Sequence, residues 1–210
     1  MIELYYSPST ASMVVHWLLI ELGIPHTLRS LDLDKREHKA PEYLAINPAG
    51  VVPALVIDGQ VILESPAIAM HLADAYPAAS LAPPPGTLQR AHYYQWFFFM
   101  ANTLQPAYRA WFYPTEPAGE ANSEASKAMA RERIETAWQR VDTHLAAKGP
   151  YLLGEKLSAA DFMLTMLMRW SRNMPKPAHT WPALAKHAAL MKARPAFKEV
   201  YAREGLSDWT

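Results

Sequence analysis

Short apolar runs and one amphipathic stretch alternate through the first part of the chain. Residues 2–6 form an apolar, aromatic run that predicts a buried strand. Apolar side chains recur at helical spacing through residues 13–22, and Gly23 marks the end of that helix. Residues 27–33 predict a second strand, and residues 35–45 are polar with helix potential in their second half. The order so far is strand, helix, strand.

A β-hairpin and a further helix follow. The β-branched runs 54–57 and 61–63 flank Asp58-Gly59, a dipeptide typical of a tight hairpin turn. Ser65 is expected to cap a helix whose first residue is Pro66 and which runs to about Tyr76. A βαβ unit, a hairpin and a helix predict a mixed four-stranded sheet in an α/β domain over residues 1–76.

The pattern changes to a helical one after a proline-rich stretch. Residues 77–86 contain Pro83-Pro84-Pro85-Gly86, which predicts a stiff linker. Residues 88–109 are helical with a break near Pro106, and residues 128–147 place apolar side chains on one face. Leu157-Ser158-Ala159-Ala160-Asp161 predicts a helix start with a variant of the capping box. Residues 87–210 are therefore expected to form an all-α domain.

Composition excludes several classes of function. Lys plus Arg and Asp plus Glu each number 20, and no basic run indicates a nucleic-acid partner. No apolar stretch approaches the roughly 20 residues that span a bilayer, and the N-terminus lacks signal-peptide features, so a cytoplasmic protein is expected. The chain has no cysteine, which excludes disulfides, thiolate metal sites and a thiol nucleophile. Its eight histidines lack paired metal-ligand spacing, so no metal is expected.

Two neighbouring segments predict a binding site for a small peptide. Pro53 opens a β-branched run, where a missing N–H costs a sheet little, and an X-Pro bond tolerates the cis form. A cis turn there would direct the backbone groups of Val52 outward, ready to pair with an extended peptide. The helix that starts near Ser65 offers unpaired N–H groups and a dipole to a carboxylate.

Four motifs, in order and along the whole chain, resemble those of the cytosolic glutathione transferases. They are Leu4-Tyr5-Tyr6-Ser7-Pro8, Asn47 to Leu55 (NPAGVVPAL), Glu64-Ser65-Pro66-Ala67-Ile68 and Leu157-Ser158-Ala159-Ala160-Asp161. The resemblance implies a thioredoxin-like N-terminal domain that binds glutathione as co-substrate, and a helical domain that shapes the electrophile pocket. It also implies a homodimer with a small hydrophobic electrophile as second substrate.

The resemblance also assigns the glutathione contacts. Pro53 falls on the family's cis-proline, and Val52, with Val51 beside it, would pair with the cysteinyl backbone. Glu64 and Ser65 match the acidic-Ser pair that holds the γ-glutamyl end, the amine on Glu64 and the carboxylate on Ser65. His38 falls where some members contact the glycyl carboxylate, with the neighbouring residues Lys35, Arg36 and Lys39 as alternatives.

The thiolate-stabilising group is expected among three hydroxyls at the turn into the first helix. Thr10 falls where several serine-type classes keep their serine, and Ala11 falls where a bacterial class carries a cysteine. Ser12 matches the serine that follows this cysteine, and Ser9 matches the first serine of the isomerase-type classes. Helix capping is the alternative role for two of these hydroxyls. The resemblance therefore indicates a bacterial member of the serine or threonine type, with Thr10 preferred, then Ser12, then Ser9.

Aromatic and methionine side chains of the helical half are the candidates for the electrophile pocket, with core packing as the alternative. They are Tyr108, Trp111, Phe112 and Met100. The expected reaction is conjugation of the glutathione thiolate to a hydrophobic electrophile. Glutathione-dependent isomerisation, dehalogenation or disulfide reduction are alternatives that use the same thiolate, and a non-catalytic glutathione or ligand-binding protein is an alternative of another class.

Overall fold

The computed structural model describes residues 1–209, which divide into two compact units. Unit 1 comprises Met1–Ala82 together with the chain from Lys192 onward, and unit 2 comprises Pro83–Met191. The sequence placed everything after residue 86 in one helical domain, so the last segment groups differently from that expectation. Its Phe197 ring packs edge-on against Trp17 at a centroid distance of 5.1 Å, which ties the segment to unit 1.

Unit 1 contains the predicted mixed four-stranded sheet, in the order β2-β1-β3-β4. Strand β1 is parallel to β2 and antiparallel to β3, which is antiparallel to β4. Leu4 of β1 lies opposite Leu55 of β3, and both are fully buried, so this pair anchors the sheet in the core. The strands are β1 (Ile2–Tyr6), β2 (Thr27–Ser30), β3 (Ala54–Ile57) and β4 (Gln60–Leu63).

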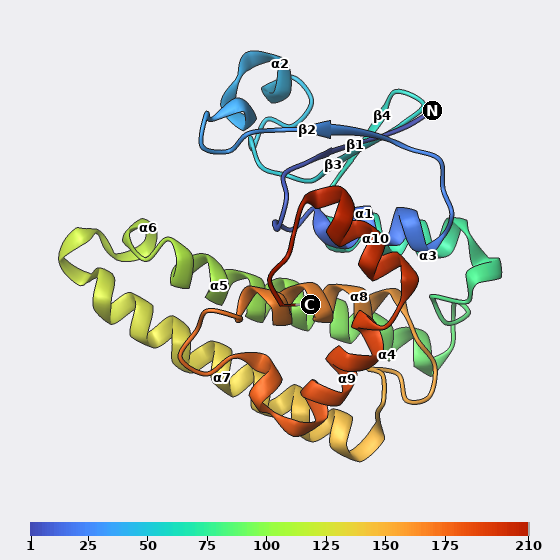
Figure 1. The fold of residues 1–210 in the computed structure, drawn as a ribbon, viewed down its shortest axis with the longest axis vertical. Coiled ribbons are helices and arrows are strands. Elements are labelled where there is room, and N and C mark those ends of the chain that lie inside the picture. The colour runs from blue at the N-terminus through green and yellow to red at the C-terminus, as the bar shows by residue number, and fades with distance from the viewer. Residues whose placement is uncertain (210) are drawn as a thin grey trace. The chain divides into compact units, whose positions relative to one another are not determined.

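Helices flank this sheet, as Figure 1 shows: α1 and α3 lie on one side of it and α2 on the other. Helix α10 packs against α1. Almost every side chain of α1 is buried, because it lies between the sheet and these neighbouring helices. The helices of unit 1 are α1 (Met13–Glu21), α2 (Pro41–Leu44), α3 (Ser65–Ala75) and α10 (Pro195–Glu204), with 3₁₀ turns at Glu37–Lys39 and Pro77–Ala79.

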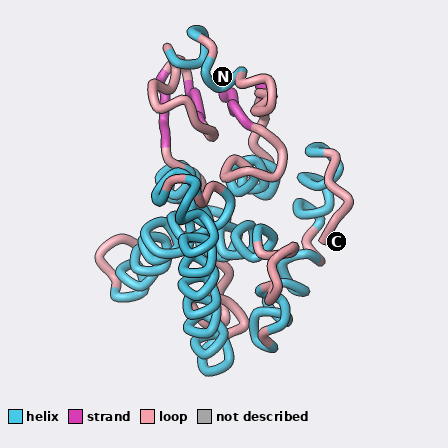
Figure 2. Tube along the Cα trace, turned by 90° about the vertical axis from the view of Figure 1, so that its left-hand side faces the viewer, coloured by secondary structure: helices cyan, strands magenta, loops and turns pink. Residues whose placement is uncertain are grey.

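Unit 2 is helical, and the strands drawn in Figure 2 all belong to unit 1. Within residues 1–209, no helix combines the length and apolar character needed to cross a membrane. The elements of unit 2 are α4 (Leu88–Phe99), the π-helical turn η3 (Met100–Leu104), α5 (Gln105–Phe112), α6 (Thr115–Ala118), the 3₁₀ turn η4 (Glu120–Asn122), α7 (Ser123–Lys148), α8 (Ala159–Trp170), the 3₁₀ turn η5 (Ala178–Thr180) and α9 (Pro182–Lys192).

The break expected near Pro106 is a widened helical turn. Because Pro106 has no N–H and its ring crowds the carbonyl four residues earlier, the preceding turn opens. The N–H of Gln105 therefore donates to Met100 O, five residues back, and the chain stays helical from α4 to α5.

The capping box predicted at residues 157–161 is present at the start of α8. Asp161 Oδ2 accepts the Ser158 N–H at 2.8 Å, and Asp161 Oδ1 accepts the Leu152 N–H at 2.8 Å. Burial raises the pKa of the Asp161 carboxyl, and the facing His187 imidazole and these donors oppose that rise. Asp161 thus fixes both the helix start and the loop before it.

Candidate functional site

The turn before β3 presents an unpaired stretch of backbone. The Val52–Pro53 peptide bond is cis, as the sequence predicts. Val51 O accepts hydrogen bonds from the Tyr43 hydroxyl at 2.6 Å and the Asn47 side-chain amide at 2.7 Å. Neither the N–H nor the C=O of Val52 has a hydrogen-bond partner among the described residues. The Tyr43 and Asn47 side chains therefore hold the turn through Val51, and the backbone groups of Val52 remain free to pair with an extended peptide.

Sequence reasoning missed the two side chains that hold this turn. Tyr43 and Asn47 are both almost fully buried, and burial raises the pKa of the Tyr43 phenol. Asn47 Oδ1 also accepts the Ala49 N–H at 3.1 Å, which tightens the loop. The Asn-Pro dipeptide at residue 47 was a signal for this turn, whereas the role of Tyr43 has no signal in the sequence.

The start of α3 forms an anion socket. The helix begins one residue earlier than the sequence predicted. Glu64, not Ser65, is the N-cap residue, so Ser65 is the first helical residue and Pro66 the second. The Ser65 N–H and the Ala67 N–H have no backbone partner among residues 1–209, and the Ser65 hydroxyl lies at the same first turn of the helix. Ser65 is buried, so these donors converge in a region of low dielectric at the positive end of the helix dipole.

Glu64 adopts an unusual backbone conformation beside this socket. Its φ is +69°, in a region that costs a non-glycine residue about 1–3 kcal/mol. Its side chain is exposed and has no ion pair within the described chain. A free carboxylate next to an anion socket suits a zwitterion that carries both an ammonium and a carboxylate group.

In the basic stretch before α2, Lys39 rather than His38 reaches the loop that leads to Val52. Lys39 Nζ donates to Ala49 O at 3.1 Å, directly beside the turn that carries Val52. His38 Nδ1 is buried without a partner in the described part of the chain. Burial, then the charges of Lys39 and Arg36, lower the pKa of His38, which disfavours the charged form. Lys39 is therefore better suited than His38 to hold a carboxylate.

The three candidate hydroxyls differ sharply in environment within the hydroxyl corner, residues 7–12. Ser12 is fully buried, and its Oγ lies 2.9 Å from Ser7 O and accepts the Ser7 N–H at 3.3 Å. Thr10 is half-buried, and its Oγ1 lies 2.7 Å from both Ser7 O and Ser12 Oγ. Ser12 precedes α1, but its side chain makes no capping bond. Thr10 is thus the one of this pair that can reach a ligand.

The hydrogen bonds of the corner allow the Thr10 hydroxyl to donate to a ligand. Both hydroxyls donate to Ser7 O, Thr10 Oγ1 at 2.7 Å and Ser12 Oγ at 2.9 Å, and the two hydroxyl oxygens lie 2.7 Å apart. Because Ser12 keeps its bond to this carbonyl, the Thr10 proton can turn from Ser7 O to an incoming acceptor and still leave the carbonyl with a partner. The Ser12 N–H, 3.3 Å from Thr10 Oγ1, continues to hold the Thr10 side chain. Ser12 therefore positions Thr10.

A buried carboxylate from α10 fastens the same corner. Glu204 Oε2 accepts the Ser9 N–H at 2.9 Å, and Glu204 Oε1 accepts from His16 Nδ1 at 2.9 Å. The His16 and Glu204 side chains are both fully buried. Ser9 has a φ of +65°, so Glu204 supports a backbone conformation that serine rarely adopts. The last helix, which sequence reasoning left out of the site, thus holds the loop that bears Thr10.

We predict that Glu204→Gln lowers both stability and activity. Glutamine can still accept the Ser9 N–H, but its amide must then face His16 Nδ1, which donates in the present arrangement. A tautomer change would move the proton to His16 Nε2, which is buried without a partner among the described residues. Either outcome leaves an unsatisfied buried donor, which costs about 1–3 kcal/mol in urea unfolding. Glu199→Gln on the same helix, a change at an exposed ion pair, is the matched control and should stay within about 0.5 kcal/mol.

Strand register brings the three elements together. Tyr5 of β1 lies opposite Ala54 of β3, and Ala54 lies opposite Leu63 of β4. The hydroxyl corner after β1, the turn before β3 and the anion socket after β4 therefore emerge at one end of the sheet. An accessible hydroxyl, a free strand edge and an anion socket at one sheet end can together bind a small peptide and donate a hydrogen bond to its side chain.

The side chains proposed for the electrophile pocket all lie in unit 2, in different environments. Met100 and Tyr108 are fully buried, and Tyr108 Oη accepts the Trp138 indole N–H at 3.2 Å. Burial raises the pKa of Tyr108. Phe112 is about half exposed and stacks on Tyr108 at 5.9 Å, and Lys127 lies over the Trp111 ring at 4.9 Å. Phe112 and Trp111 are the two of this set accessible to a ligand.

Within residues 1–209, no three His, Asp or Glu side chains are grouped to hold a metal ion.

Comparisons with known proteins match both units. Residues 4–84 match the model of the glutathione S-transferase N-terminal domain, and residues 101–204 match that of the C-terminal domain. Glutathione S-transferase GstA of Escherichia coli O157:H7 is 30% identical over 97% of this chain and 99% of its own.

Solved structures give the same result. A glutathione transferase homologue from Sulfitobacter with bound glutathione has a TM-score of 0.91 and 27% identity, with 99% of each chain covered. A sphingomonad glutathione S-transferase complexed with glutathione has a TM-score of 0.84 and 30% identity, covering 98% of this chain and all of its own. These matches span nearly the whole sequence, in agreement with the geometry of the site. The chain belongs to the glutathione S-transferase family.

Proposed function

We propose that this protein conjugates the thiolate of glutathione to hydrophobic electrophiles. The convergence of the hydroxyl corner, the Val52 edge and the Ser65 socket at one end of the sheet is the observation that carries this proposal. Val52 pairs with the cysteinyl backbone, Ser65 binds the γ-glutamyl carboxylate, and Glu64 binds the ammonium group. Lys39, with His38 beside it, serves the glycyl carboxylate. Each charged group of the tripeptide thus meets a group of opposite charge or a donor.

Thr10 is the proposed catalytic residue. A free thiol titrates near 8.5, and a hydrogen bond to a charged group contributes about 1.5–3 kcal/mol. At about 1.4 kcal/mol for each pKa unit, one such bond lowers the pKa of the bound thiol by about one to two units. The thiol proton leaves to solvent, the Thr10 hydroxyl donates to the sulfur, and the thiolate becomes the major form near neutral pH. Its sulfur then forms a bond to the electrophilic carbon. On an aryl halide the halide departs with the displaced electron pair, whereas on an epoxide or enal that pair stays on the substrate, which takes up a proton from solvent.

Unit 2 supplies the apolar surface for the electrophile in this proposal, with Trp111 and Phe112 as its accessible side chains and Met100 and Tyr108 packed behind them. A cytoplasmic location, expected from the sequence, belongs to the same proposal.

Binding and chemistry are tested separately. Calorimetry should show that glutathione binds at millimolar concentration or below, and assays with aryl halides, epoxides, enals and organic peroxides should show glutathione-dependent product. Binding with no turnover across that panel would favour the non-catalytic carrier. If glutathione does not bind, both the transferase proposal and the carrier alternative are wrong.

A homodimer is the second part of the proposal. Helix α4 exposes apolar side chains at helical spacing, with Leu88 75% and Phe98 57% accessible and Tyr94 between them. We predict that Phe98→Glu shifts the sedimentation coefficient from dimer to monomer, because it places a charge in an apolar contact. Met129→Glu, at a similarly exposed apolar position on α7, should leave the dimer intact. If the protein without substitutions sediments as a monomer, the proposed homodimer is wrong.

A further inference from the structure

A groove on the surface of unit 1 has no role in the proposed reaction. It is open to solvent and has a volume of about 430 Å³, within the range of small-molecule sites. The end of α1, the loop that follows it and α10 line the groove. Its apolar wall consists of Leu19, Ile20, Ile24 and Pro25.

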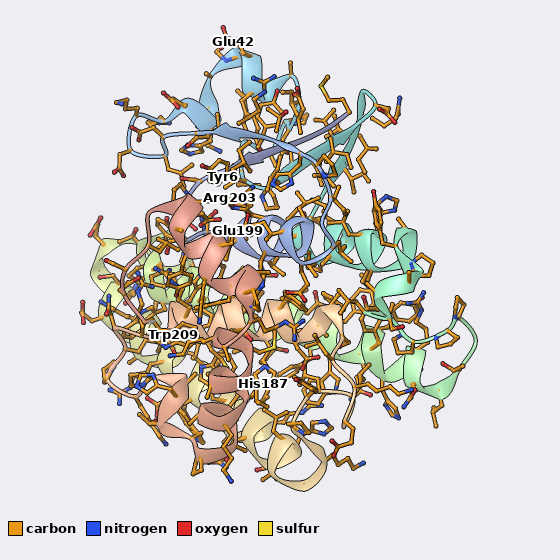
Figure 3. The ribbon with its side chains drawn as sticks, turned by 45° about the vertical axis from the view of Figure 1, so that its right-hand side comes forward. Tyr6, Glu42, His187, Glu199, Arg203 and Trp209 are labelled. Carbon is orange, nitrogen blue, oxygen red and sulfur yellow. The ribbon has the colours of Figure 1, made fainter. Side chains whose placement is uncertain are left out.

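The polar end of the groove has an excess of hydrogen-bond donors. Arg203 Nη2 donates to Glu199 Oε1 at 2.5 Å, and Figure 3 shows both side chains on α10. A guanidinium carries five N–H donors, and Arg203 has no other bond among the described residues. The Nη1 edge of this fork therefore remains open to a planar anion while Nη2 keeps Glu199.

His26 closes the same end in a defined tautomer. Its Nδ1 lies 2.7 Å from Ile24 O, so Nδ1 carries a proton. Burial is the main cause that lowers the pKa of His26, and the His16 imidazole and the Arg203 guanidinium lower it further. The Ile24 carbonyl and the Glu199 carboxylate oppose this lowering. His26 is therefore favoured as a neutral group, and Arg203 is the cation of the groove.

We propose that this groove binds a small carboxylic acid with an apolar body, such as an aryl-alkyl carboxylate. The apolar body packs on Ile20, Ile24 and Pro25, and the carboxylate takes the open edge of Arg203. The aliphatic wall favours a hydrocarbon body, and the open guanidinium edge favours a planar anion over an ammonium group. The groove is a different site from the proposed glutathione site, because none of its lining residues belongs to the hydroxyl corner, the Val52 turn or the Ser65 socket.

Nuclear magnetic resonance can test this proposal on the full chain, with S-methylglutathione present to fill the thiol site. Phenylpropionate should shift the amide signals of Gly23 and Ile24 and the ring signals of His26, saturating in the millimolar range. It should also raise the titration midpoint of His26, because a carboxylate bound beside the imidazole favours its charged form. Phenylpropionamide, the neutral isostere, should bind at least fivefold more weakly.

Arg203→Met keeps an apolar stem but removes the guanidinium, so it should abolish the preference for the acid over the amide. Arg131→Met removes a similar exposed Arg–Glu pair, spaced four residues apart on α7, and should leave that preference unchanged. Equal shifts with the acid and the amide would overturn the proposal. So would shifts that grow linearly without saturation, or a preference that survives in Arg203→Met.

Discussion

Thr10→Ala is expected to lower kcat/KM for conjugation by about ten- to a hundredfold. The lost hydroxyl removes one hydrogen bond to a thiolate, worth about 1.5–3 kcal/mol, and each 1.4 kcal/mol is a factor of ten. The rest of the corner survives this change, because Ser12 Oγ still lies 2.9 Å from Ser7 O and can donate to it. Near neutral pH, the affinity for glutathione should therefore change much less than turnover does. Calorimetry measures the affinity, and steady-state kinetics measures the turnover.

Matched variants separate this role from a structural one. Thr10→Ser keeps the hydroxyl and should retain most of the activity. Ser12→Ala removes a fully buried hydroxyl that bonds the Ser7 backbone, so it should destabilise the protein by about 1 kcal/mol and reduce turnover less than Thr10→Ala does. If Ser12→Ala or Ser9→Ala has the larger effect on turnover with little loss of stability, the assignment to Thr10 is wrong.

Ser65→Ala is expected to weaken glutathione binding by about ten- to a hundredfold. Ser65 is a buried residue at a helix N-terminus, and a bond from its hydroxyl to a carboxylate is worth about 1.5–3 kcal/mol. The pKa of the bound thiol should not change, because the strand pairing at Val52 still directs the cysteinyl group to the hydroxyl corner. Calorimetry measures the affinity, and the ultraviolet thiolate band reports the pKa.

A double-mutant cycle assigns this loss to one contact. The glutathione analogue that lacks the γ-glutamyl α-carboxylate should bind the unmodified protein weakly, and Ser65→Ala should weaken it no further. If Ser65→Ala weakens glutathione and this analogue equally, the hydroxyl does not contact the carboxylate.

The sequence predicted those parts of the fold that rest on local chemistry. The Asp58-Gly59 hairpin and the capping box at Asp161 are found as expected, because turn and cap residues act through neighbours in the chain. The start of α3 was misplaced by one residue, since Ser65-Pro66 resembles a cap followed by a first helical residue. Glu64 takes the cap position with a positive φ that no local preference indicates.

Long-range contacts explain what the sequence could not show. Thr10 and Ser12 are both hydroxyl residues two positions apart, and only packing makes Ser12 fully buried and leaves Thr10 accessible. Glu204 reaches Ser9 across 195 positions of sequence, so no spacing rule connects them. Tyr43 likewise meets Val51 through a loop whose conformation the sequence left open.

The pKa of the glutathione thiol bound to the unmodified protein is the most direct test of the proposed chemistry. A pH titration of the ultraviolet thiolate band at saturating glutathione should give a midpoint about one to two units below the free value near 8.5. A midpoint at or above the value of free glutathione would show that the hydroxyl corner does not stabilise the thiolate, and would contradict the proposed reaction.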